Sequence, residues 1–271
     1  MLAALLNDAR IYAHSAQKGG RYLCPGCKAE LVLRKGDIVI HHFAHKPPVE
    51  CEFGAGESAE HLEAKLAIFK AFAPRALKAE MEWPVESLTG DRRADVFIWD
   101  MQGAKIAFEI QHTEISGELI AKRSADYMRA GISVIWIPVL KSKFRAQAAR
   151  VKDGEPGDWL VPNYRPRPFE SWLHAFNYGQ IWYWAPRAKQ LMRGKMEQLM
   201  EKVENTFIGG PQEHSIGWAL RLWGPHEPSS LALRVGARAE KQAGRHWLPA
   251  GPVAKLETVG GKVSQDGLDI S

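Results

Sequence analysis

The apolar residues of two segments recur with the period of an α-helix. Between residues 57 and 73, Leu62, Leu66 and Phe69 are spaced by four and three residues, and Pro74 ends the run. Residues 118–130 also have a helical pattern, which stops at Gly131. We therefore expect a helix in each segment, with an apolar side that faces a core.

Four further segments have the character of β-strands. Residues 81–88, 94–100 and 104–111 are bounded by turn-forming residues and carry β-branched and aromatic side chains. Residues 132–137 form an almost unbroken apolar run, which is typical of a strand buried on both faces. The order helix, three strands, helix, strand predicts an α/β domain over residues 55–141.

Weaker patterns flank this domain. Residues 3–6, 29–33 and 37–41 predict short strands of a small β module over residues 1–54, which has too little core to fold unaided. Residues 142–228 are basic and aromatic, and residues 187–204 have an amphipathic helical pattern, so an α-rich extension is expected there. Residues 229–271 are predicted to form a mobile tail.

The composition places the chain among ordinary globular proteins. Of its 271 residues 45% are hydrophobic and 25% charged, which excludes fibrous and wholly disordered classes. No apolar run approaches the roughly 20 residues that cross a bilayer, so we expect a cytoplasmic protein with no membrane partner. The formal charge of +5 permits a polyanionic partner without proving one.

Two carboxylates are expected to meet in the hairpin of residues 94–111. A three-residue turn that ends at Gly103 is a common closure, and it sets Phe97 opposite Ala107 and Asp95 opposite Glu109. Opposed residues have Cβ atoms roughly 5 Å apart, where like charges destabilise a sheet. A hard divalent cation such as Mg²⁺ or Mn²⁺ would compensate this repulsion.

The sequence leaves open which other polar residues belong to this site. Gln111 shares the strand face of Glu109 by alternation. Glu57, His61 and Lys65 form one stripe on the first predicted helix, which is either part of the same site or a solvated face. A turn of two or four residues would slip the hairpin register, and the acids would then lie scattered on a solvated strand face.

Two groups of aromatic and basic residues have two interpretations each. Arg123 and Tyr127 are spaced at i and i+4, so they form either a phosphate contact with a neighbouring hydroxyl or a stacked pair at the sheet edge. Residues 172–184 concentrate Trp, Tyr and Phe, which could stack unpaired bases or fill a core.

The N-terminal module carries a pattern of zinc ligands. Cys24-Pro-Gly-Cys27 is followed by His42-Phe-Ala-His45, which together supply four ligands for a tetrahedral Zn²⁺ site. A small module gains much stability from such a metal. The alternative is a reduced cysteine turn beside a strand end. Two further residues could replace a named ligand, namely His41 and Cys51.

These motifs, taken in order, resemble a known family. An acid on the first helix, Asp95 on the second strand and Glu109-x-Gln111 on the third resemble the restriction-endonuclease-like core of the PD-(D/E)XK nuclease superfamily. Over residues 1 to about 140 the chain is similar to the CoiA-like competence protein family. The motifs that carry this second resemblance are Cys24-x-x-Cys27, His42-x-x-His45, Glu57-Ser58-x-x-His61-x-x-x-Lys65, Arg93-Ala-Asp95, Glu109-Ile-Gln111 and Gly131-Ile-x-Val-Ile-Trp136.

The resemblance implies a role for each site residue. Asp95 and Glu109 would hold Mg²⁺, Glu57 would complete or orient the metal site, and His61 would carry a proton or orient a ligand. Most of the superfamily has Lys where this chain has Gln111, so Lys65 or Lys105 could take over its charge. The residues expected to contact nucleic acid are Arg93, Arg123 and Tyr127.

The function predicted from these observations is metal-dependent cleavage of DNA. The resemblance associates it with the handling of incoming DNA in naturally competent bacteria, or with recombination. One alternative is a DNA-binding accessory protein that keeps the fold without cleaving, as Gln111 allows. Another is a nucleic-acid-binding zinc module attached to a protein-interaction domain, in which Asp95 and Glu109 would be dispensable.

Overall fold

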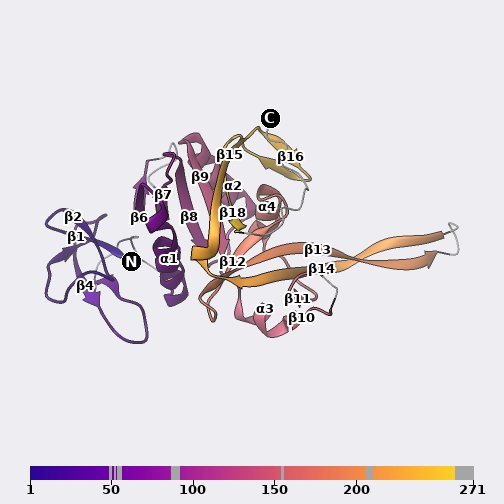
Figure 1. The fold of residues 1–271 in the computed structure, drawn as a ribbon, viewed down its shortest axis with the longest axis horizontal. Coiled ribbons are helices and arrows are strands. Elements are labelled where there is room, and N and C mark those ends of the chain that lie inside the picture. Colours follow the sequence, from indigo (N-terminus) through magenta and orange to yellow (C-terminus); the bar gives the residue numbers. More distant parts are fainter. Residues whose placement is uncertain are drawn as a thin grey trace.

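The computed structural model describes most of the chain as one arrangement of sheets and helices (Figure 1). The described residues are 1–48, 51, 53, 57–86, 92–153, 156–205 and 210–259. In that part of the chain no helix is both long and apolar enough to cross a membrane.

The N-terminal module is a five-stranded antiparallel sheet with the strand order β2-β1-β3-β4-β5. Its strands are β1 (Ala3–Leu6), β2 (Ala9–Tyr12), β3 (Tyr22–Leu23), β4 (Glu30–Arg34) and β5 (His42–His45). The strand expected over residues 37–41 is wrong. Ile38 is 96% exposed, and Phe43 of β5 enters the core of the module instead.

The central domain has the predicted order of elements. It comprises α1 (Ala59–Phe72), β6 (Lys78–Val85), β7 (Arg92–Trp99), β8 (Lys105–Gln111), α2 (Gly117–Arg129) and β9 (Ile132–Pro138), with a 3₁₀ turn (Ala73–Arg75) after α1. Its sheet runs β6-β7-β8-β9, antiparallel except for the parallel pair β8 and β9. Every residue of β9 is buried, as the unbroken apolar run predicts.

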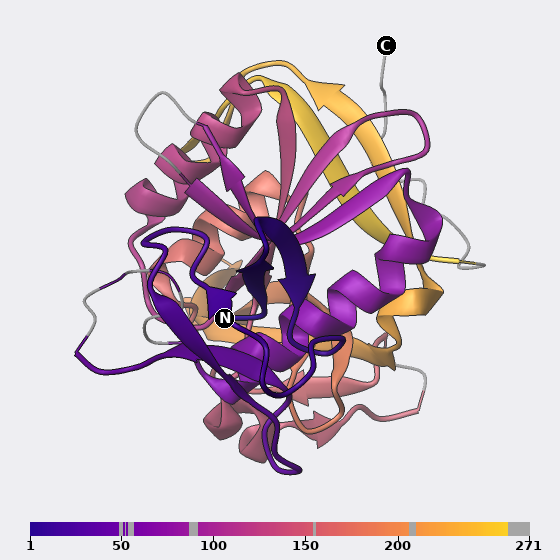
Figure 2. The same ribbon diagram turned by 90° about the vertical axis from the view of Figure 1, so that its left-hand side faces the viewer.

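The two helices cover opposite faces of this sheet (Figure 2). On one face, Leu62 and Ile68 of α1 pack with Val96 and Phe108. On the other, Tyr127 of α2 belongs to a separate core. The alternation of each strand divides its apolar residues between these two cores.

The C-terminal region is rich in strands, so the predicted α-rich extension is wrong. One sheet has the order β10-β11-β14-β13-β12, with two short helices beside it. These elements are α3 (Ser142–Gln147), β10 (Ala149–Arg150), β11 (Trp159–Val161), α4 (Pro168–Phe176), β12 (Ile181–Ala185), β13 (Gln190–Asn205) and β14 (Gly210–His226). The β13–β14 hairpin extends beyond the body of the molecule (Figure 1).

The expected helix over residues 187–204 corresponds to most of β13. Met192 and Met196 are buried while Lys195 between them is exposed, which is the alternation of a strand. The aromatic cluster of residues 172–184 lies mainly in the core; in it, Tyr178 is the exposed member. This burial argues against the base-stacking interpretation.

The expected mobile tail contains regular structure. Residues 231–258 form β15 (Leu231–Arg238) paired with β18 (Gly251–Thr258), and a small hairpin of β16 (Lys241–Ala243) and β17 (His246–Leu248), after a 3₁₀ turn (Pro228–Ser230). Residues 260–271 of the predicted tail lie outside the described residues.

Candidate functional site

The β7–β8 hairpin has the register that the three-residue turn predicts. Phe97 pairs with Ala107, and the ladder ends at Val96 and Phe108. Just beyond this end, the backbone N–H of Ile110 donates to Oδ2 of Asp95 at 2.9 Å. The next position on the partner strand is Glu109, and both acids are buried.

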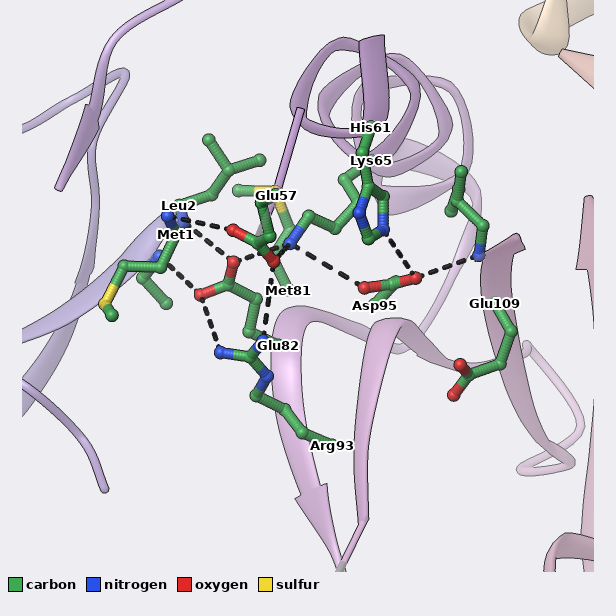
Figure 3. A network of polar contacts seen from close by, with 12 residues as sticks. Met1, Leu2, Glu57, His61, Lys65, Met81, Glu82, Arg93, Asp95 and Glu109 are labelled. Atoms are coloured by element: carbon green, nitrogen blue, oxygen red, sulfur yellow. Dashed lines mark hydrogen bonds and ion pairs between the residues drawn. The ribbon is translucent and has the colours of Figure 1, made fainter. Parts of the chain in front are cut away.

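Asp95 lies between two side chains of α1 (Figure 3). His61 Nε2 is 2.9 Å from Oδ2 of Asp95, and Lys65 Nζ is 3.7 Å from Oδ1. Burial raises the pKa of Asp95, but His61, Lys65 and the Ile110 amide outweigh it and lower this pKa to about 2. Asp95 is therefore a carboxylate at neutral pH.

Lys65 joins three carboxylates in the interior. Its side chain is 0% exposed, and Nζ donates to Glu57 and, at 2.7 Å, to Oε1 of Glu82. Burial lowers the pKa of Lys65, yet Glu82, Asp95 and Glu57 together raise it above its ordinary value. Burial raises the pKa of Glu57, but Lys65 and the Met1 ammonium bring it to about 2. Two residues of the predicted helix stripe, His61 and Lys65, thus belong to the site and not to a solvated face.

Glu82 is a site residue that the sequence analysis missed. It lies within β6 at φ +55, a left-handed conformation that costs a non-glycine residue roughly 1–3 kcal/mol. Its carboxylate accepts hydrogen bonds from the backbone N–H groups of Leu2 at 2.8 Å and Ala3 at 3.1 Å (Figure 3). A glutamate between the apolar residues Met81 and Trp83 is the one signal that could have indicated it.

Glu109 is held by α2. Arg123 donates to Oε2 of Glu109 at 2.8 Å, and the Tyr127 hydroxyl donates to Oε1. Burial raises the pKa of Glu109, and the negative charge of Asp95 raises it further. Arg123 and Tyr127 lower this pKa, but the net shift is upward. The i, i+4 pair therefore contacts an acid of the site, and the buried Tyr127 does not form a stacked pair at the sheet edge.

Three other predicted residues, Gln111, Lys105 and Arg93, have separate surroundings. Gln111 is buried, and its Nε2 donates to the Thr113 carbonyl at 2.7 Å. Lys105 is exposed at the far end of the hairpin, opposite Trp99, so Lys65 is the lysine that lies among the acids. The Arg93 guanidinium lies 3.4 Å from Oε1 of Glu57.

The chemistry of Asp95 and Glu109 fits a hard divalent cation. Both supply carboxylate oxygens, which Mg²⁺ prefers. Among the residues that the structure describes, the polar group beside Asp95 Oδ1 is the Lys65 ammonium, at 3.7 Å. Burial and the nearby Asp95 raise the pKa of Glu109 despite its two donors, and a bound cation would stabilise the ionised carboxylate.

A second cluster lies in the N-terminal module. The ligand atoms of Cys24, Cys27, His45 and Cys51 all lie within 4.8 Å of one another, and no other group of three or more His, Cys, Asp or Glu in the described ranges is as close. Cys27 Sγ is 3.4 Å from His45 Nε2, and Cys24 Sγ is 3.9 Å from Cys51 Sγ. Three thiols and one imidazole are a typical set for structural zinc.

The expected ligand set needs one correction. Cys51 takes the place of His42, because residues at i and i+3 of a strand point to opposite faces and β5 contains both His42 and His45. Nδ1 of His42 is instead 2.9 Å from the Ile40 carbonyl. His41, the other spare residue, is also outside the cluster.

We expect Cys51→Ser to lower the zinc content well below one per chain, because it removes one of four ligands from a site that stabilises the module. His42→Ala, the matched control on β5, should keep its zinc. Elemental analysis of both purified variants checks this. Full zinc in Cys51→Ser with loss in His42→Ala would contradict the Cys₃His site.

Comparison with known proteins assigns the family. Residues 6–54 match the N-terminal domain of Competence protein CoiA, and residues 57–192 match its nuclease-like domain. The chain is 29% identical over 121 residues to the Competence protein CoiA of Bacillus subtilis (strain 168), an alignment that covers 44% of this chain and 32% of that protein. The chain thus matches about a third of the length of this relative. No solved structure shows significant similarity. With its N-terminal and nuclease-like segments both matched in order, the chain belongs to the CoiA competence protein family.

Proposed function

We propose that this protein is a metal-dependent nuclease that hydrolyses phosphodiester bonds in DNA. The observation that carries the proposal is the pair of buried acids, Asp95 and Glu109, on adjacent strands at the end of the β7–β8 ladder. The nuclease-like domain family supports the same reaction class. The family also supports a role in the handling of DNA during competence.

Each side chain of the site has its own role in the proposed reaction. A Mg²⁺ ion bound by Asp95 and Glu109 would supply a Lewis acid and would lower the pKa of a bound water. Lys65 keeps its proton, so its ammonium can offset negative charge that develops on the phosphoryl group. His61 orients Asp95 through Nε2 and could accept or deliver a proton.

Residues around these groups position them. Arg123 and Tyr127 fix the Glu109 carboxylate from α2 through two donors. Glu57 and Glu82 hold the Lys65 ammonium beside Asp95. Under this proposal Lys65 takes the role that Gln111 leaves vacant on β8.

Two observations favour a second candidate, a DNA-binding protein that keeps the nuclease fold without cleaving. The Gln111 side chain is turned toward Thr113, and Lys65 is shared among three carboxylates, which restrains it from reaching a substrate. The two candidates differ in their dependence on metal.

The deciding experiment incubates purified protein with labelled single-stranded and double-stranded DNA in Mg²⁺, Mn²⁺ or EDTA. A nuclease gives products with metal and none with EDTA. Retarded but intact DNA under all three conditions would support the binding protein instead.

We expect Gln111→Lys to weaken Mg²⁺ binding and to slow cleavage about tenfold or more. Lys65 already lies beside Asp95, and like charges a few ångströms apart repel by about 1–4 kcal/mol. Calorimetric Mg²⁺ titration and cleavage rates measure both effects. Thr113→Val, which alters the same loop without a charge, is the control. A faster Gln111→Lys enzyme would show that Lys65 does not supply the missing charge.

A further inference from the structure

Three cations of the C-terminal strands lie beside two aromatic rings at the end of α4, those of Phe176 and Tyr178. Lys255 Nζ lies 3.6 Å and Lys241 Nζ 4.5 Å from the centroid of Tyr178, which is 40% exposed at the end of α4. The neighbouring Arg238 guanidinium lies 4.3 Å from the ring centroid of Phe176. We call Tyr178, Arg238, Lys241 and Lys255 the Tyr178 cluster.

Arg238 is buried without a carboxylate partner. The residue is 7% exposed, and its guanidinium donates to the carbonyls of Phe176 at 2.9 Å and Pro249 at 3.4 Å. Carbonyl oxygens satisfy hydrogen bonds but do not neutralise the charge. Buried charges in proteins are normally paired with an opposite charge, so an anion beside Arg238 would be stabilised.

The nearby acids are engaged with other residues. Between residues 228 and 259 the chain has five Lys and Arg residues but only two acids, Glu240 and Glu257. Trp247 Nε1 donates to Glu240, and Arg234 lies 3.2 Å from Glu257. Across the part of the chain that the structure describes, no ion pair joins a carboxylate to Arg238, Lys241 or Lys255.

The electrostatics of Lys255 reflect this imbalance. Burial lowers its pKa, Glu257 opposes the shift, and Lys241 and Arg238 lower the pKa further. The net direction is downward, with burial as its largest cause, so Glu257 does not offset burial and the two neighbouring cations together. An anion among the three cations would oppose this shift.

We propose that the Tyr178 cluster binds phosphate groups of a nucleic-acid strand. A phosphodiester presents negative oxygens to the ammonium groups and to the guanidinium, and such contacts dominate nucleic-acid affinity. β18, which carries Lys255, packs on α2: a Cβ at Gly251 would lie 2.9 Å from Cβ of Met128. Since α2 also carries Arg123, which contacts Glu109, the strand that carries Lys255 packs on a helix that reaches the candidate site.

This proposal takes its substrate class from the proposed function, but its test does not depend on cleavage. The full-length protein is titrated into fluorescein-labelled duplex DNA in EDTA, and anisotropy is followed over a series of salt concentrations. The test variant is Lys241→Gln/Lys255→Gln. The matched control is Lys18→Gln/Lys143→Gln, which removes two exposed lysines elsewhere.

We expect the test variant to bind DNA at least about tenfold more weakly at low salt. The slope of log affinity against log salt should become shallower by about 2, because two phosphate contacts are lost. The control should bind like the parent. Lys241→Arg/Lys255→Arg keeps both charges and should keep the affinity, which separates a charge effect from misfolding.

Several outcomes would overturn the proposal. These are a parent that does not bind DNA, a test variant with the affinity and slope of the parent, or equal losses in the control. Binding of phosphatidylglycerol vesicles in place of DNA, lost in the same test variant, would assign the cluster to a lipid surface. Failure of the cleavage proposal gives a different signature, namely intact DNA in Mg²⁺ with binding unchanged.

Discussion

Asp95→Asn and Glu109→Gln are each expected to reduce Mg²⁺-dependent DNA cleavage by at least about 10²-fold, because loss of one positioned charge in a preorganised site has an effect of this order. Asp95 is ionised through its contacts with His61 and Lys65, and asparagine keeps the shape while losing the charge. Cleavage rates on labelled DNA measure the loss. Calorimetric titration should show a matching loss of Mg²⁺ affinity.

The control for these substitutions is Glu118→Gln, an exposed acid on α2, which should cleave at the parental rate. Both site variants should keep the parental circular dichroism spectrum and DNA affinity in EDTA. If either variant cleaves as fast as the parent, the two acids do not share a cation.

Lys65→Met is expected to lower the free energy of unfolding by about 3–5 kcal/mol, because removal of one partner leaves a buried charge uncompensated. In this chain the ammonium faces Glu57, Glu82 and Asp95, and the side chain is 0% exposed. Methionine fills a similar volume, so the loss reports charge and not a cavity. Urea denaturation of parent and variant measures it.

Two variants sharpen this measurement. Lys70→Met, on the exposed face of the same helix, should change the free energy of unfolding by less than about 0.5 kcal/mol. Adding Glu82→Gln to Lys65→Met should recover part of the lost stability, since the two residues are in contact and their effects are not additive. A Lys65→Met protein as stable as the parent would mean that the three acids bear little buried charge.

The parts of the fold that could be predicted are those determined by local pattern. The apolar spacing of Leu62, Leu66 and Phe69 identified α1, and a turn ending at Gly103, at φ +82, fixed the register around Asp95. Both signals depend on residues close together in the sequence. The prediction of an α-rich extension was wrong because the apolar pattern of residues 187–204 is compatible with a helix and also with the alternation of a strand. The pairing of β13 with β14 selects the strand.

The site residues that the sequence missed or left open depend on contacts between distant segments. Glu82 is held by the backbone amide groups of Leu2 and Ala3, which lie 80 and 79 positions earlier in the chain. Cys51 was open in the sequence as a possible replacement ligand, and the structure places it in the cluster while strand alternation sends His42 away from His45. The residues alone also left open whether His61 and Lys65 join Asp95; the family resemblance implied it, and the structure places both beside Asp95.

The hydrogen bonds from Leu2 and Ala3 to Glu82 mean that the boundary between the two family segments is not a boundary between independent folding units. A fragment that starts at residue 57 would lack both amide donors of a carboxylate that is 1% exposed in the intact chain. Such a fragment would retain Lys65 and the strained backbone at Glu82 without the contacts that stabilise them. The zinc-cluster strands and the nuclease-like sheet should therefore unfold in one cooperative transition. An isolated nuclease-like domain should be less stable than the same domain in the longer chain.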